Sequence, residues 1–164
     1  MAGRPAPLGV VGVNSLAWGQ LNLNVPDRIR PFIKMAPTLY YIMCGGTTQL
    51  ALGQSAAGIY TSMDTIADSV ISEVEAYAPL TVVRVIAQTT TPSTGFSAAS
   101  NLILAALNNL VRANTNGFAG VVDLDTDAGL ANPYSSSYDD GTHPSTLGNA
   151  AIANLTGTVL NSLI

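Results

Sequence analysis

The residues best suited to chemistry lie in one short segment near the end of the chain, Tyr138-Asp-Asp-Gly-Thr-His-Pro144. His143 is the single histidine of the sequence, and Asp140 lies three residues before it. An Asp-x-x-His turn places a carboxylate beside the imidazole, where it fixes the tautomer of the ring and stabilises the imidazolium. A histidine held in this way can act as the base that activates a serine hydroxyl. Asp139 is the neighbouring alternative, and the three-residue spacing favours Asp140.

A serine in a suitable position occurs near the beginning of the chain, in Gly12-Val-Asn-Ser-Leu-Ala-Trp-Gly19. The preceding run, Leu8–Val13, is short and apolar, which is typical of a buried strand ending in a turn. We therefore expect Ser15 at the end of a strand. The chemistry requires that this strand end and the segment around His143 meet in space.

The elements that must position these residues alternate along the chain. Short apolar runs predict four strands, at Leu8–Val13, Thr38–Cys44, Thr81–Ala87 and Gly120–Leu124. Apolar residues at steps of three and four predict a helix from Ile59 to Tyr77, with one buried face. Strands alternating with helices imply a parallel sheet covered on both faces, with ligands bound beyond the carboxyl ends of the strands.

Three further helices are predicted. One begins at an N-cap Ser97, turns Ile103, Ala106, Leu107 and Leu110 inward, and ends before Gly117. The last helix is opened by Pro144. A shorter helix from Pro26 to Met35 is interrupted by Pro31. The resulting prediction is a three-layer α/β/α, flavodoxin-like fold with four to five parallel strands, in a single domain over residues 1–164.

Several motifs together resemble the SGNH/GDSL hydrolase family. That family opens on a strand followed by a Gly-Asp-Ser-type motif, and it closes with Asp-x-x-His-Pro before the last helix. Here the opening reads Gly12-Val-Asn-Ser15, and the closing reads Asp140-Gly-Thr-His-Pro-Ser145. The resemblance implies a serine esterase with Ser15 as nucleophile, His143 as base and Asp140 as the orienting acid. It also implies an acyl-enzyme intermediate and, as substrates, acetyl or short-acyl esters, lipid esters or acetylated sugars.

The family holds the oxyanion with the serine amide, a glycine amide and an asparagine side chain, and this chain departs from that pattern. In the segment Gly45-Gly-Thr-Thr-Gln49, Thr48 stands where the family has asparagine, and Gln49 stands where it has aspartate. The family's glycine block has no clear counterpart, so Asn22, Asn24 or Gly19 would have to replace it. The expected oxyanion and substrate-binding residues are Ser15, Gly46, Thr48 and Asn22. One strand–helix unit of the family is missing between residues 16 and 37, which predicts an open, shallow site.

Two other classes of function compete with the hydrolase. The altered oxyanion residues suggest an SGNH-like carbohydrate-recognition module that has lost efficient catalysis. The composition, with 48% hydrophobic and 10% charged residues, suggests a homo-oligomer formed through an apolar patch. The sequence leaves the compartment open, although the low charge weakly favours an extracytoplasmic location.

The charge and the cysteine content of the chain limit which partners, metals and cofactors are expected. The net charge is −4, with one lysine and no basic run, so neither nucleic acid nor an anionic membrane surface is an expected partner. No apolar run reaches the ~18 residues of a membrane span, and no leader peptide is recognisable. Cys44 is alone and expected to be buried. With one cysteine and one histidine there is no zinc spacing, and Asp123–Tyr134 lacks the residues of a calcium loop, so no metal or cofactor is expected.

Overall fold

The computed structural model describes residues 38–164. The elements in chain order are β1 (Thr38–Met43), α3 (Thr47–Ala51), α4 (Ala56–Tyr77), β2 (Val82–Gln88), α5 (Ala98–Ala113), β3 (Gly120–Val122), a 3-10 turn (Leu124–Thr126) and α6 (Thr146–Ser162). The predicted strand at 8–13 and the predicted helix at 26–35 lie outside the described residues.

The strands form a parallel sheet in the order β1-β2-β3. Tyr41 pairs with Val85 and Ala87 with Val121, so β2 is the central strand of the described sheet. The described residues contain three strands, fewer than the four to five predicted. The three strands predicted within this range are all present, and the fourth, Leu8–Val13, lies outside it.

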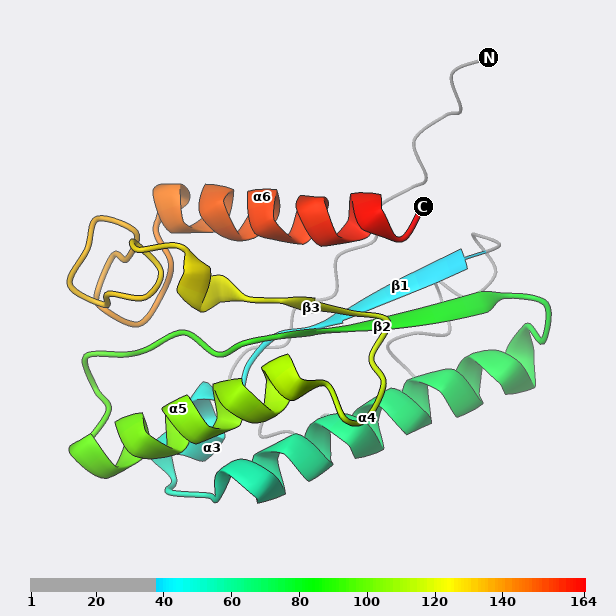
Figure 1. Cartoon of the computed structure of the whole chain (residues 1–164), viewed down its shortest axis with the longest axis horizontal. Helices are drawn as coiled ribbons and strands as arrows, with labels where there is room; N and C mark the ends of the chain where they lie inside the picture. Colours follow the sequence, from blue (N-terminus) through cyan, green and yellow to red (C-terminus); the bar gives the residue numbers. More distant parts are fainter. Residues whose placement is uncertain (1–37) are drawn as a thin grey trace, which may run out of the picture.

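Helices cover both faces of the sheet, which confirms an α/β architecture (Figure 1). On one face, α4 and α5 build the larger apolar core with side chains such as Ile59, Ile66 and Leu107. On the other face, α6 packs against Ile86 and Val122 of the sheet. The segments that follow the three strands all begin at the same end of the sheet, the carboxyl end, as parallel pairing requires.

Helix α4 forms where the spacing of apolar residues predicts a helix. Its N-cap is Ser55, whose Oγ accepts a hydrogen bond of 3.1 Å from the amide of Gly58. Ile59, Ile66 and Val70 are fully buried, and burial of each such side chain stabilises the fold by about 1.5–3 kcal/mol. Tyr77, expected on the same face, is 49% exposed because it is the last residue of the helix.

The helix α5 begins at Ser97 as predicted, and the Ser97 Oγ accepts the amide of Ser100 at 3.0 Å. The buried stripe is rotated by one residue from the predicted one, because Leu104 is buried and Ala106 is exposed. Two polar residues lie on the buried face, Ser100 and Asn108. Their side chains are hydrogen-bonded. Apolar periodicity does not predict their burial, because both residues are polar.

The last helix begins slightly later than predicted. Ser145, not Pro144, is the N-cap of α6, and its Oγ accepts the amide of Gly148 at 3.3 Å. Gly148 is buried against the carbonyl of Ser137, where a Cβ would have no room. This contact joins the start of α6 to the loop that carries the Asp140–His143 pair.

Cys44 is exposed, which corrects the prediction of a buried thiol, because the strand β1 ends one residue before it. No helix within residues 38–164 combines the length and apolarity needed to cross a lipid bilayer.

Candidate active site

Asp140 and His143 form the pair that their spacing predicted. The Nδ1 atom of His143 lies 2.7 Å from Oδ2 of Asp140, and the His143 amide donates to Oδ1 of the same carboxylate at 2.8 Å. The Thr142 amide donates a third hydrogen bond to Oδ1, at 2.9 Å. A carboxylate at Nδ1 accepts the proton carried there, so Nε2 is the basic nitrogen able to accept a proton from a hydroxyl.

A narrow turn holds this pair. The Asp139 amide donates to the carbonyl of His143 at 3.0 Å, and Tyr138 forms an antiparallel bridge with Pro144. Gly141, within the turn, has a φ of 80°, a conformation that favours glycine. A Cβ on Gly141 would also overlap the side chain of Thr94, so both the backbone and the packing require glycine there.

The electrostatics of the turn keep Asp140 ionised. Hydrogen bonds from the His143 amide, the His143 ring and the Thr142 amide lower the pKa of Asp140 from 3.8 to about 2. The pair is accessible from solvent, with 75% of the His143 side chain and 57% of the Asp140 side chain exposed. Asp140 is therefore ionised at neutral pH, which is the state required of a carboxylate that orients a basic histidine.

The predicted oxyanion segment lies at the end of β1. Gly46 is the N-cap residue of α3, with a φ of 96°, and it is buried. Thr48 lies in the first turn of α3 and is exposed. Within residues 38–164, the connection between this segment and the Asp140–His143 turn runs through the β2–α5 loop.

The β2–α5 loop, residues 89–97, makes hydrogen bonds on both sides. Towards α3, the Thr90 hydroxyl donates to the carbonyl of Gly45 at 2.5 Å. Towards the His143 turn, the Ser93 and Thr142 hydroxyls lie 2.6 Å apart, and the Thr94 amide donates to the carbonyl of Gly141 at 2.9 Å. These bonds could not be predicted, because contacts between distant segments leave no local pattern in the sequence.

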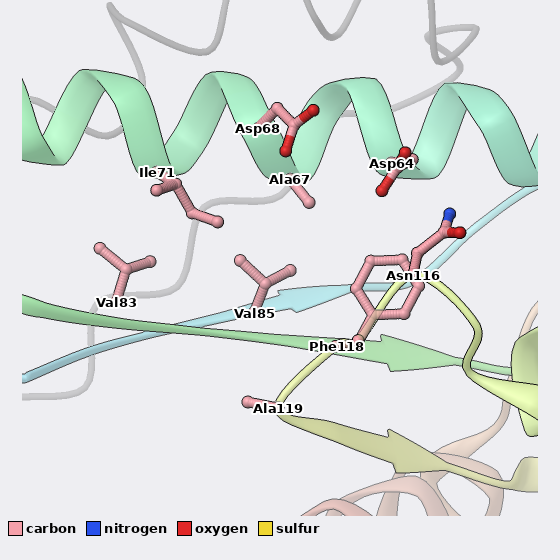
Figure 2. A pocket seen from close by; sticks show the side chains of 10 residues that line it. Asp64, Ala67, Asp68, Ile71, Val83, Val85, Asn116, Phe118 and Ala119 are labelled. Carbon is pink, nitrogen blue, oxygen red and sulfur yellow. The ribbon is translucent and has the colours of Figure 1, made fainter.

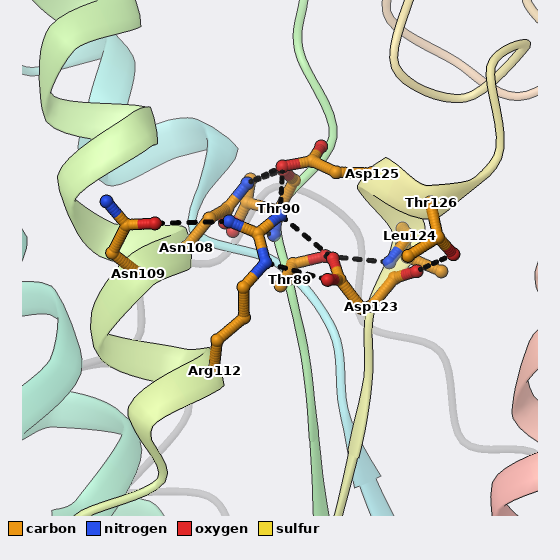
Figure 3. A network of polar contacts seen from close by, with 9 residues as sticks. All are labelled: Thr89, Thr90, Asn108, Asn109, Arg112, Asp123, Leu124, Asp125 and Thr126. Atoms are coloured by element: carbon orange, nitrogen blue, oxygen red, sulfur yellow. Dashed lines mark hydrogen bonds and ion pairs between the residues drawn. The ribbon is translucent and has the colours of Figure 1, made fainter.

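A second polar cluster fixes the start of this loop to α5 and to the segment after β3 (Figure 3). Asn108 is 1% exposed, and its side-chain amide both accepts from the Thr90 amide and donates to the Thr90 carbonyl, at 2.9 Å each. Its Nδ2 also donates to Oδ2 of Asp125 at 2.9 Å. Arg112 contacts Asp123 at 2.7 Å and Asp125 at 2.6 Å, and its hydrogen bond lowers the pKa of Asp123.

Gln49 is a buried polar residue whose amide is unsatisfied. It is 2% exposed, and neither Nε2 nor Oε1 has a hydrogen-bond partner among residues 38–164. Most buried polar side-chain atoms in proteins do have a partner. The position is the one where the resemblance places an aspartate beside the oxyanion asparagine.

The remaining predicted site residues, Ser15 and Asn22, lie outside the described residues, as do the alternatives Gly19 and Asn24. The close approach of the Ser15 hydroxyl to His143 therefore stays a prediction.

A shallow cavity lies elsewhere on the molecule, between α4 and the sheet (Figure 2). Its lining includes Asp64 and Asp68 of α4, Val83 near the start of β2, and Phe118 just before β3. These strand beginnings place the cavity at the amino edge of the sheet, opposite the edge that carries Asp140 and His143. It is therefore separate from the candidate active site.

The fold and the site together define an α/β protein with a parallel sheet and an acid–histidine turn before its last helix. Two solved structures share this fold, each with a TM-score of 0.57 and 21% sequence identity. One is a carbohydrate esterase family 3 protein from Talaromyces cellulolyticus, and the other is a mutant acetyl esterase solved with an acetate ion. Each match covers 89% of this chain and 66% of the other, so the chain spans just under two thirds of their length. Neither a family model nor a curated protein matches the sequence.

Proposed function

We propose that this chain is an SGNH-type serine esterase that hydrolyses acetyl or other short-acyl esters of carbohydrates. The observation that carries the proposal is the 2.7 Å contact between His143 and an Asp140 that stays ionised. The fold shared with a carbohydrate esterase and an acetyl esterase supports the choice of substrate class.

The proposed reaction is acyl transfer through the serine. Nε2 of His143 takes the proton of the Ser15 hydroxyl as Ser15 Oγ attacks the ester carbonyl. The tetrahedral oxyanion is held by the Ser15 amide, with Gly46, Thr48 and Asn22 as further donors. His143 then protonates the leaving alcohol, and water activated by the same histidine releases the acid from Ser15.

The test is hydrolysis of p-nitrophenyl acetate by the wild type, Ser15→Ala and His143→Ala. We expect each substitution to lower kcat by about 10³-fold or more. Cys44→Ser is the matched control, because Cys44 is an exposed thiol at the same end of β1 as Gly46, and it should leave kcat unchanged. Equal activity of the wild type and Ser15→Ala would reject the proposed nucleophile.

A carbohydrate-recognition module is the second candidate, and Thr48 is the observation that favours it. Removal of one oxyanion donor typically costs about 10²–10³ in rate, and a threonine stands where the family has its asparagine. Inactive wild-type protein that binds an acetylated oligosaccharide in calorimetry would select the module over the esterase.

A further inference from the structure

We propose that Thr90 is a positioning residue, which uses its hydroxyl to set the backbone that carries the oxyanion donors Gly46 and Thr48. This inference rests on the proposed function for its effect on the rate. Its geometric part concerns only residues within the described range 38–164.

The Thr90 hydroxyl is directed at the oxyanion segment. It donates to the Gly45 carbonyl at 2.5 Å, and a Cβ built on Gly46 would lie 3.0 Å from the same hydroxyl oxygen. The peptide that joins Gly45 to Gly46 has its carbonyl oxygen bound to Thr90. Because a peptide unit is planar, fixing that carbonyl also fixes the direction of the Gly46 N–H.

Thr90 itself is held rigidly. Asn108 bonds both its amide and its carbonyl, each at 2.9 Å, from the buried face of α5. The neighbouring Thr89 hydroxyl accepts the Leu124 amide at 2.8 Å and lies 3.3 Å from Oδ1 of Asp123. The hydroxyl at position 90 is therefore presented by a backbone anchored to two other elements, and it has little freedom to move away from Gly45.

The rate of the proposed reaction depends steeply on the position of each oxyanion donor. A donor must lie within hydrogen-bond distance of the oxyanion of the transition state, and a misplacement of about 1 Å can cost about 100-fold in rate. Loss of the Thr90 hydroxyl frees the Gly45–Gly46 peptide to rotate. Substrate binding away from the reacting carbonyl is unaffected, so the loss should appear in kcat.

The experiment uses Thr90→Val, which removes only the hydroxyl, and Thr90→Ser, which retains it. Thr65→Val is the matched control, because the Thr65 hydroxyl also donates to a backbone carbonyl, that of Thr61 at 3.0 Å, on the exposed face of α4. We expect Thr90→Val to lower kcat about 10- to 100-fold with KM within twofold. Thr90→Ser should recover most of the loss, and Thr65→Val should match the wild type.

A second readout does not depend on activity. Amide hydrogen exchange at Leu50, whose N–H donates to the carbonyl of Gly46, should be about 10-fold faster in Thr90→Val. The Ile59 amide, at the start of α4, should be unchanged. Unchanged exchange at Leu50, an unchanged kcat, or a serine variant as impaired as the valine variant would each overturn the positioning role. A wild type with no Ser15-dependent activity would reject the proposed function, and exchange at Leu50 would then decide the positioning role alone.

Discussion

At the scale of single residues, the Asp140 carboxylate shows how three hydrogen bonds define a partner for a base. Its oxygens accept two amides and face one imidazole nitrogen, although the side chain is more than half exposed. Local geometry, not burial, therefore produces its low pKa.

The pH dependence of Asp140 follows from this. Its folded pKa of about 2 lies below the ordinary value of 3.8, so the carboxylate is stabilised in the folded state. The contribution to stability is complete above the unfolded pKa and is lost as the pH falls through the folded one. We expect carbon-detected NMR of Asp140 to titrate at a pH of about 2, and a midpoint at the ordinary value of 3.8 would contradict the three hydrogen bonds.

Gln49 gives a prediction about stability. A buried amide normally finds hydrogen-bond partners, and none is present within residues 38–164, so we expect the partner of the Gln49 amide to lie outside this range. Gln49→Leu leaves that partner without its hydrogen bond. We therefore expect the substitution to lower the free energy of unfolding of the full chain by about 1–3 kcal/mol. Urea denaturation measures this value. An unchanged or higher stability would show that the amide is unpaired in the folded protein.

At the scale of elements, the polar cluster around Arg112 joins α5 to the segment after β3. Arg112→Lys keeps the charge but loses the planar fork that contacts Asp123 and Asp125 together. The guanidinium is partly exposed, so we expect a loss of only about 1 kcal/mol. Thermal unfolding measures it, with Arg84→Lys, at an exposed position of β2, as the control. An equal loss of stability in Arg84→Lys would mean that the contacts of Arg112 with Asp123 and Asp125 do not stabilise the fold.

The sequence predicted elements better than it predicted the contacts between them. The Ile59 to Tyr77 period, the Ser97 cap and three short apolar runs each depend on neighbouring residues, and the described fold confirms them. The burial of Asn108 could not be predicted, because its partner Thr90 is 18 positions away. One usable signal was present, which is an asparagine between the apolar residues Leu107 and Val111 of a helix that the sequence predicts.

The candidate site divides in the same way. The Asp140–His143 pair was predictable because one short turn suffices to form it. The bonds from Thr90 to Gly45 and from Ser93 to Thr142 span 45 and 49 positions, and they become visible only once the sheet has aligned its strands.

At the scale of the whole molecule, the short connection before β1 bears on substrate choice. Only residues 16–37 separate Ser15 from β1, which is shorter than the connection in the SGNH family that the motifs resemble, and the Asp140–His143 pair is exposed. If the proposed esterase has the open site that the sequence predicts, a long acyl chain finds little surface to contact, so we expect acetyl esters to be hydrolysed faster than decanoyl esters. Comparison of kcat/KM for the two p-nitrophenyl esters decides this, and a strong decanoyl preference would count against it.

The joining of distant segments by the β2–α5 loop also bears on how the protein is made. The ribosome synthesises Gly45 well before Thr142. The hydroxyl and carbonyl groups that meet through this loop are therefore hydrated while the residues between them are made. The contacts that join this loop to the Asp140–His143 turn can therefore form only after Gly141 and Thr142 have been synthesised.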